Sequence, residues 1–311
     1  MQRGDRDRPS KSVRRPRRGR AILGRPSVFS ASLAAATAVI VFLAVFSHAA
    51  RQEAEATARA LGDLRALLNA AGCSLDCATH EIAYGLYTIK PATDEQLVRT
   101  ALWLRTELRL YGVDCLPRFG LRQMSLCSGL EVEGEQRGFH VAYESERMLI
   151  STDVVESNEL FATRALHHEL SHIMEGRMGR GRYEDPEWNA TNVHGMEYGE
   201  GGHLDRDPWH SIYDIRLRGV LTEYSRASNA EDKAEVFATM MTRPLYLKLR
   251  CMIDGVLRDK VALTERRWRE FCPEFSESFW GTIHDRRVQM RDELGLPRLS
   301  HKLELPRLSR E

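Results

Sequence analysis

The spacing of apolar residues predicts a helix over residues 159–175. Leu166, Leu170 and Ile173 recur at i, i+4 and i+7, which places them on one face of an α-helix. Neither proline nor glycine interrupts the segment before Gly176, which we expect to end it. The segment is therefore predicted as an amphipathic helix with one apolar face.

Other apolar patterns predict strands before this helix and further helices around them. The expected strands are 121–127, 138–143 and 147–151, and the expected helices are 51–72, 93–111, 228–244 and 245–295. Strands followed by a mainly helical remainder are typical of an α+β fold. We expect a small sheet that packs on the helix at 159–175, with the last helices packed behind it.

The first fifty residues separate into a basic segment and an uncharged one. Residues 1–26 carry ten Lys and Arg residues against two Asp, whereas residues 27–50 carry no charged side chain. An uncharged run of this length can span a bilayer, and its basic flank keeps the N-terminus in the cytoplasm. Small residues at positions 47 and 49 also suit cleavage by signal peptidase. A retained signal anchor and a cleaved signal peptide both stay open, and the length of the run favours the anchor.

Both interpretations place the chain from residue 51 outside the cytoplasm, either tethered to the membrane by the N-terminal segment or secreted. We expect residues 51–295 to form the exported domain and residues 296–311 a flexible tail. The whole chain has a net charge of +1, but the charges of residues 51–311 sum to −7. A mildly acidic domain lacks the basic surface that nucleic acid requires, so nucleic acid is excluded as a partner.

All six cysteines follow the uncharged run, as expected of residues that reach an oxidising compartment. An even number of cysteines indicates up to three disulfides. The pairing that we expect is the short-range one, Cys73 with Cys77, Cys115 with Cys127, and Cys251 with Cys272. A zinc site built from cysteines is the competing interpretation, which the lack of a C-x-x-C sequence disfavours.

The predicted helix carries the sequence His-Glu-Leu-Ser-His at 168–172, which fits the pattern H-E-x-x-H. Residues i and i+4 share a helix face, so His168 and His172 can both reach one zinc ion. Glu169 lies about 100° around the axis, where it can act as general base on a water at the metal's open position. His167 does not have the spacing to join. A solvated, charged helix face is the competing interpretation, and the apolar stripe around the motif argues against it.

A catalytic zinc site usually has three protein ligands, and the helix at 228–244 offers the third. Glu231 and Glu235 are four residues apart and share a face, so we predict Glu231 as the ligand and Glu235 as acceptor for the free ring nitrogen of a ligating histidine. Ser228 with Glu231 also forms a capping-box sequence, which would direct Glu231 to the backbone. Asn229 with Asp232 offers a similar cap and would leave Glu231 free.

Tyr224 stands shortly before this helix. A phenol near the zinc can donate a hydrogen bond to the oxyanion that develops during hydrolysis. An ordinary half-buried tyrosine is the competing interpretation, and the residues alone leave both open.

Three segments together resemble a known group of enzymes. They are His-Glu-Leu-Ser-His at 168–172, Asp-Pro-Glu-Trp-Asn at 185–189, and the run from Leu-Thr-Glu-Tyr to Glu-Val-Phe at 221–237. The chain resembles the zinc-binding metallopeptidases of the gluzincin type, which are similar in their catalytic part to the anthrax lethal factor protease. The resemblance covers roughly residues 146 to 244, or about a third of the chain.

The resemblance implies a role for each matching residue. In that group the first Glu of an E-x-x-x-[ED] helix is the third zinc ligand and the second carboxylate supports a ligand, which implies these roles for Glu231 and Glu235. A tyrosine seven residues before the ligand stabilises the oxyanion, and Tyr224 holds that position. The segment 195–199 also resembles the group, with no catalytic role implied. The cysteines and the N-terminal segment differ from lethal factor, so delivery to a host cytosol is not implied.

The residues and the resemblance lead to one main hypothesis and one rival. The main hypothesis is an exported or membrane-tethered zinc metallopeptidase with a zincin-like domain, whose peptide or protein substrate adds as a strand to the exposed sheet edge. The rival is a non-enzymatic cell-envelope module with structural zinc or none. Glu169 and Tyr224 argue against the rival, because a structural zinc site needs neither.

Overall fold

The computed structural model describes residues 28–179, 184–201 and 212–299. The chain divides into one unit up to Arg51 and a second, compact unit from Gln52. The basic segment predicted over 1–26 lies outside the described residues. Within the described ranges we find no helix with both the length and the apolar character that a bilayer crossing requires.

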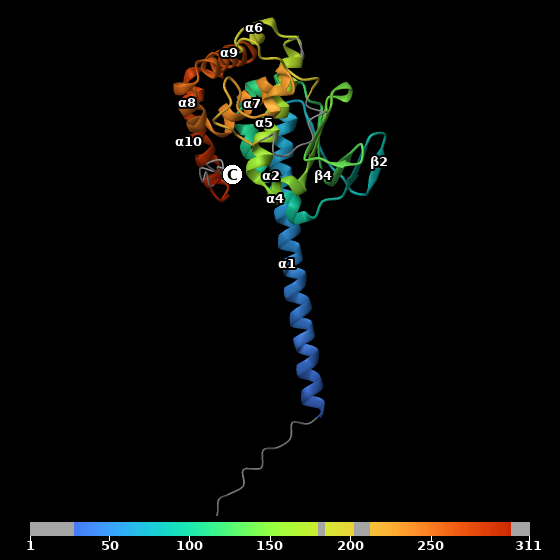
Figure 1. Cartoon of the computed structure of the whole chain (residues 1–311). Coiled ribbons are helices and arrows are strands. Elements are labelled where there is room, and N and C mark those ends of the chain that lie inside the picture. The colour runs from blue at the N-terminus through green and yellow to red at the C-terminus, as the bar shows by residue number, and fades with distance from the viewer. Residues whose placement is uncertain (1–27, 180–183, 202–211, 300–311) are drawn as a thin grey trace, which may run out of the picture. The chain divides into compact units, whose positions relative to one another are not determined.

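A mixed, seven-stranded sheet forms one side of the second unit (Figure 1). Its strands are β1 (Ser74–Cys77), β2 (Ile82–Tyr84), β3 (Tyr87–Lys90), β4 (Gln123–Val132), β5 (Glu135–Gln136), β6 (Phe139–Ala142) and β7 (Arg147–Ser151). The order is β2-β3-β4-β7-β6, with β1 and β5 each also paired to β4. The first half of β4 runs parallel to β1 and β7, while its second half pairs antiparallel with β3 and β5. The predicted strands are thus present as β4, β6 and β7.

Helices and the loops between them make up the rest of the described chain. They are α1 (Val28–Ala70), α2 (Asp94–Arg109), α3 (Gly112–Cys115), α4 (Thr152–Ser157), α5 (Glu159–Arg177), α6 (Pro186–Asn189), α7 (Asn229–Thr242), α8 (Pro244–Ile253), α9 (Gly255–Phe271) and α10 (Glu277–Glu293), with short 3-10 turns η1 (Leu116–Phe119), η2 (Tyr143–Ser145) and η5 (Tyr224–Arg226). Each helix predicted within residues 51–295 is present, and 245–295 is divided into α8, α9 and α10. The strands and helices together confirm the predicted α+β class.

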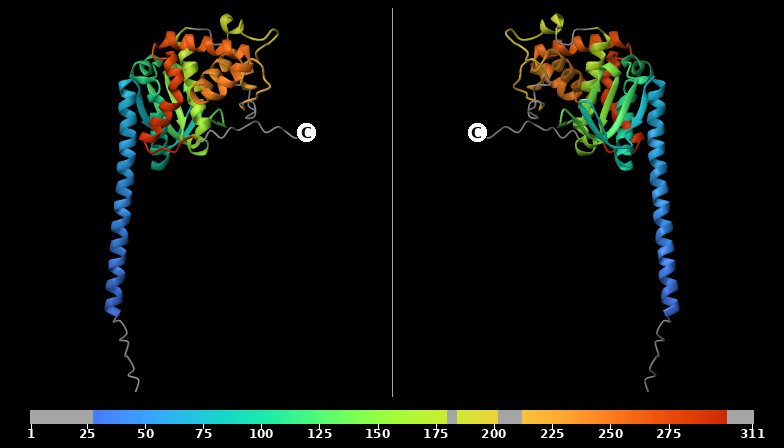
Figure 2. Two further views of the ribbon diagram at one scale, coloured as in Figure 1. Left: turned by 90° about the vertical axis from the view of Figure 1, so that its left-hand side faces the viewer. Right: turned by 90° about the vertical axis from the view of Figure 1, so that its right-hand side faces the viewer.

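The predicted apolar stripe of α5 packs into the main core. Leu166, Leu170 and Ile173 are buried there together with Met148 and Ile150 of β7. Burial of this stripe against the sheet fixes the rotation of α5, so its opposite face turns towards α7. A second buried cluster around Trp188 and Leu221 lies on the other side of α7. Figures 1 and 2 show the C-terminal helices, coloured orange to red, gathered on the side of α5 and α7 away from the sheet.

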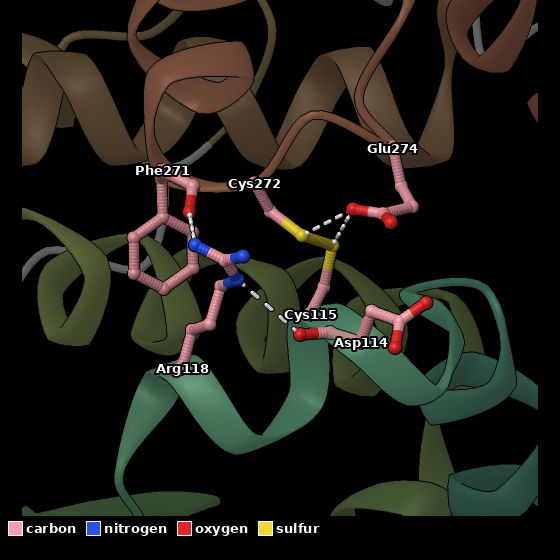
Figure 3. Close-up of a disulfide and its surroundings, with 6 residues drawn as sticks. All are labelled: Asp114, Cys115, Arg118, Phe271, Cys272 and Glu274. Atoms are coloured by element: carbon pink, nitrogen blue, oxygen red, sulfur yellow. Dashed lines mark hydrogen bonds between the residues drawn. A yellow bond between two sulfur atoms is a disulfide. The ribbon is translucent and has the colours of Figure 1, made fainter.

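One disulfide joins two distant parts of the chain (Figure 3). Cys115 at the end of α3 is bonded to Cys272 at the end of α9, with a sequence separation of 157. Arg118 reinforces this junction, because its Nη1 donates to the carbonyl of Phe271 at 3.0 Å. The cross-link therefore ties the helix that precedes β4 to the C-terminal helical part.

The predicted short-range cysteine pairing is wrong. The cysteines without a disulfide are Cys73, Cys77, Cys127 and Cys251. Cys77 ends an extended strand that begins directly after Cys73, so their Cα atoms are separated by about 13 Å, well beyond the ~7 Å reach of a disulfide. Cys127 lies buried within β4 and Cys251 on α8, and the partners predicted for them are bonded to each other instead.

Candidate metal centre

Helices α5 and α7 bring three potential metal ligands to one point. His168 and His172 stand one turn apart on α5, and Glu231 projects from the first turn of α7. Oε2 of Glu231 lies 2.8 Å from Nε2 of His168 and 3.3 Å from Nε2 of His172. The two Nε2 atoms lie 3.1 Å apart. Glu231 is 63 and 59 positions away from the two histidines in the sequence. The three side chains nevertheless present one ligand atom each to a shared centre.

The donor set and its spacing fit a zinc ion. Two imidazoles and a carboxylate are the ligands of many catalytic zinc sites, and atoms about 2.0–2.2 Å from a tetrahedral zinc lie roughly 3.3 Å from one another. The three separations between His168, His172 and Glu231 are close to that value. Within the described residues, one other group of this kind exists, formed by Cys115, Cys272 and Glu274. Its sulfur atoms are bonded to each other and are not the thiolates that bind metal.

The start of α7 leaves the Glu231 carboxylate free for the centre. Ser228 is the N-cap and its hydroxyl accepts from the Glu231 backbone N–H at 3.2 Å. The cap predicted from Asn229 and Asp232 is therefore wrong, but the reciprocal half of a Ser228 capping box does not form either, because the Glu231 side chain points to the histidines. Only the backbone of Glu231 takes part in capping.

Electrostatics keep Glu231 ionised. Burial raises the pKa of its carboxyl, but the imidazoles of His172 and His168 outweigh this effect and hold the pKa well below its ordinary value. The carboxylate is the form that can coordinate a cation, so the site presents its third donor in the required state at neutral pH.

Glu235 occupies the supporting position predicted for it. Its Oε1 lies 3.0 Å from Nδ1 of His168, and its Oε2 accepts from Arg164 and, at 3.3 Å, from the hydroxyl of Thr222. A carboxylate at this nitrogen favours the tautomer that carries its hydrogen on Nδ1, which leaves the Nε2 lone pair of His168 turned to the centre. The cation of Arg164 is itself stacked over the ring of Tyr213 at 4.6 Å.

Glu169 and Tyr224 flank the centre. Glu169 follows His168 on α5 and is partly buried. Tyr224 begins the turn η5 that leads into α7, and its ring centroid lies 5.9 Å from that of His168. Both predicted catalytic side chains are thus on segments that adjoin the three potential ligands.

Buried ion pairs surround Lys233, and they were not predicted from the sequence. Its Nζ lies 2.7 Å from a carboxylate oxygen of Glu175 on α5 and 3.2 Å from one of Asp185. Arg267 of α9 binds both oxygens of Asp185, at 2.7 and 2.9 Å. Since charges out of water need partners, this cluster connects α5, α7 and α9 around the segment before α6.

A second cluster surrounds Asp232. Its Oδ2 accepts from Lys260 of α9 at 2.6 Å, from the Trp188 indole at 2.9 Å and from the Tyr198 hydroxyl at 2.7 Å. The segments 185–189 and 195–199, for which the resemblance implied no catalytic role, therefore hold the helix that carries Glu231. A sequence signal was available: α7 has apolar residues all round its axis, so it is buried and its charged residues must be paired internally.

His167 belongs to a separate buried network, as its spacing implied. Its Nδ1 lies 2.6 Å from the hydroxyl of Tyr111 and its Nε2 lies 2.9 Å from Glu107, which also binds Arg287 of α10. Burial raises the pKa of Glu107, but Arg287 and His167 outweigh it and lower the pKa to about 2. Burial lowers the pKa of His167 in spite of that carboxylate. The network anchors the face of α5 that is turned away from the centre.

Comparisons with known proteins bear on the fold. No protein-family model matches the chain, and no curated protein matches it. Among solved structures, the chain is similar to a putative zinc-binding metallo-peptidase from Bacteroides caccae ATCC 43185, with a TM-score of 0.55 and 17% sequence identity. The match covers 78% of this chain and 95% of that chain. At this identity the similarity shows a shared fold, with the mixed sheet and the helical C-terminal part.

Proposed function

We propose that the protein is a zinc-dependent metallopeptidase in which His168, His172 and Glu231 hold the metal. The observation that carries the proposal is the approach of three donor atoms from two helices to 2.8–3.3 Å of one another. The Glu235 carboxylate at Nδ1 of His168 supports it, because that contact directs the other ring nitrogen to the centre. The shared fold with a protein named as a zinc-binding metallo-peptidase is consistent with it.

Each residue around the centre has a defined part in peptide hydrolysis. Zinc, when bound, polarises the scissile carbonyl and lowers the pKa of an attacking water. Glu169 accepts the proton of that water and passes it to the leaving amine. Tyr224 donates a hydrogen bond to the oxygen that becomes negatively charged. Glu235, held by Arg164, keeps the His168 ring in one orientation throughout.

The proposed substrate is a peptide or protein in extended form. Strand β6 pairs with β7 and, among the described strands, with no other, so its outer backbone edge faces away from the sheet. An extended peptide can add to such an edge through backbone hydrogen bonds. Strand β6 also lies against α5, which carries His168, His172 and Glu169. An added strand would therefore run past the proposed catalytic residues.

We also propose, from the sequence, that the domain acts outside the cytoplasm, anchored or secreted. The support is the uncharged run at 27–50 behind a segment with ten basic residues. The cross-link between Cys115 and Cys272 suits an oxidising compartment.

The deciding experiment combines metal analysis with a peptide-library assay on the full-length chain and Glu169→Gln. We expect the wild type to contain zinc and to lose hydrolysis on chelation. Glu169→Gln should keep the zinc and lose about 10²–10⁴-fold in hydrolysis, because the metal ligands remain and the proton acceptor is gone.

Glu95→Gln, which makes the same change at an exposed position on α2, is the matched control and should keep full activity. Undiminished cleavage by zinc-loaded Glu169→Gln would refute the assigned role. A wild type that binds zinc but cleaves no peptide in the library would favour a non-enzymatic module instead.

A further inference from the structure

Helix α8 exposes an apolar stripe to solvent. Leu245, Leu249 and Met252 follow one another at helical spacing and are 68%, 61% and 75% exposed. The opposite side of the helix is anchored by Leu247 and Arg250, both buried. The orientation of α8 is thus set by its buried side, and the exposed stripe is not a consequence of loose packing.

Further exposed apolar side chains stand at the end of α8 and on the loop that is hydrogen-bonded to this helix. Ile253 at the end of α8 is exposed, and so is Ile215. This loop is held to the buried side of α8, where Arg250 donates to the carbonyls of Asp214 and Leu217 at 2.9 and 2.7 Å. Most of the exposed large apolar side chains in the described part of the second unit stand on α8 or on this loop. We call this surface the α8 face; it comprises Ile212, Ile215, Leu245, Leu249, Met252 and Ile253.

Basic residues stand on α8 and on the segments that adjoin it in the chain or by hydrogen bonds. Lys248 is exposed within the stripe, and Arg216, Arg218 and Arg258 are exposed on the adjoining segments. Arg216 is paired with Asp214 and Arg258 lies next to Asp259, but Lys248 and Arg218 have no carboxylate partner among the described residues. The face is therefore positive within a chain whose residues 51–311 sum to −7.

We propose that the α8 face docks on the surface of an anionic phospholipid bilayer. A helix with an aliphatic side flanked by Lys and Arg lies in the membrane interface, where the apolar side chains enter the acyl boundary and the cations meet lipid phosphates. Aliphatic residues on a convex helix suit lipid better than a protein partner, whose contacts favour aromatic anchors in pockets. Charge complementarity selects the anionic lipid. Docking goes beyond the proposed hydrolysis and does not depend on it.

The test places a fluorescent reporter on the face. Leu249→Trp in the full-length chain is mixed with vesicles of phosphatidylcholine, with or without phosphatidylglycerol, that contain brominated acyl chains. We expect the added tryptophan to be quenched by the brominated chains only when phosphatidylglycerol is present. The wild type supplies the background from its own tryptophans.

Leu86→Trp is the matched control, since Leu86 is 66% exposed in the turn between β2 and β3. Figure 1 shows β2 on the side of the unit opposite to α8, so a reporter there marks a face that does not take part in the proposed docking. Equal quenching of the two reporters, or none at Leu249→Trp, would overturn the proposal.

A charge reversal tests the basic rim separately. Lys248→Glu in the Leu249→Trp background should lower the docking equilibrium of the α8 face about 5- to 30-fold, read from the bromine quenching of the reporter, because each charge near an anionic surface changes the partition coefficient about fivefold. Lys90→Glu makes the same change on β3 and should have no effect. An equal effect of the two reversals would contradict docking through the α8 face.

The same tryptophan reporter also detects self-association, in which a second copy of the chain covers the α8 face. In that case the Leu249→Trp emission shifts to the blue with rising protein concentration in the absence of vesicles, and phosphatidylglycerol has no effect. This outcome would replace lipid docking with self-association.

Discussion

Helices α7 and α8 are neighbours in the chain and distribute their polar and apolar side chains in opposite ways. Helix α7 buries charged residues, among them Asp232, Lys233 and Glu235, each at most 3% exposed. Helix α8 exposes Leu249 and Met252. Charges leave water only when a partner is built for them, and apolar side chains remain in water at a cost. The buried charges of α7 and the exposed apolar residues of α8 are therefore both unusual placements that require an explanation.

The two helices differ in where these side chains find their partners. Every buried charge of α7 meets its partner inside the molecule, so the helix is held in one position and Glu231 with it. The apolar residues of α8 are exposed within the described part of the chain, and the complement that we propose for them is a lipid surface. Internal pairing fixes the geometry of the candidate metal centre, while association is the role that we propose for the exposed stripe.

The largest effect is expected from breaking an internal pair of α7. Asp232→Ala removes the carboxylate from the buried ammonium of Lys260, and we expect a loss of about 3–5 kcal/mol in the free energy of unfolding, measured by urea denaturation. Asp259→Ala, on the exposed side of α9, should cost less than about 1 kcal/mol. Similar stabilities of the two variants would mean that the buried pair does not hold α7.

The next effect contrasts the two sides of α8. Leu247→Ala should lower the free energy of unfolding by about 2–5 kcal/mol, because Leu247 is 4% exposed and its removal leaves a cavity. Leu249→Ala, two positions along the same helix, should change it by no more than about 0.5 kcal/mol. Comparable losses in the free energy of unfolding for the two variants would show that the stripe is covered in solution.

The smallest effect concerns Glu235, whose partner is the His168 ring. Glu235→Gln keeps an acceptor but removes the charge that faces Arg164, so zinc binding should weaken about 10- to 100-fold in a chelator competition. Glu223→Gln, at a half-exposed position before η5, is the control and should bind zinc as the wild type does. If Glu235→Gln kept the affinity of the wild type, the carboxylate would not orient the histidine.

Local patterns were enough to predict the elements that carry the centre. The period of Leu166, Leu170 and Ile173 and the spacing of His168 and His172 both depend on residues within two or three helical turns. The contact of Glu231 with these histidines joins residues about sixty positions apart. Local patterns left the role of Glu231 open, and the family resemblance implied that it is the third ligand. The structure brings the three side chains together as that resemblance implied.

Long-range partners without such a guide were missed. Strand β1 pairs parallel to β4 almost fifty residues later, and short strands of this kind carry little periodicity of their own. The disulfide was mispredicted because proximity in sequence says little about proximity in space. Asp232 was considered only as part of a helix cap with Asn229, and Lys233 was given no role, since their partners on α9 and before α6 come from separate segments.

The bond between Cys115 and Cys272 closes a covalent ring around both histidines and Glu231. A single proteolytic cut in an exposed turn inside that ring does not divide the molecule into two. The nicked chain would run as one band on a denaturing gel without reductant and as two bands with it. A cut between α5 and α7 would thus leave the histidines and the glutamate on different polypeptides that still travel together.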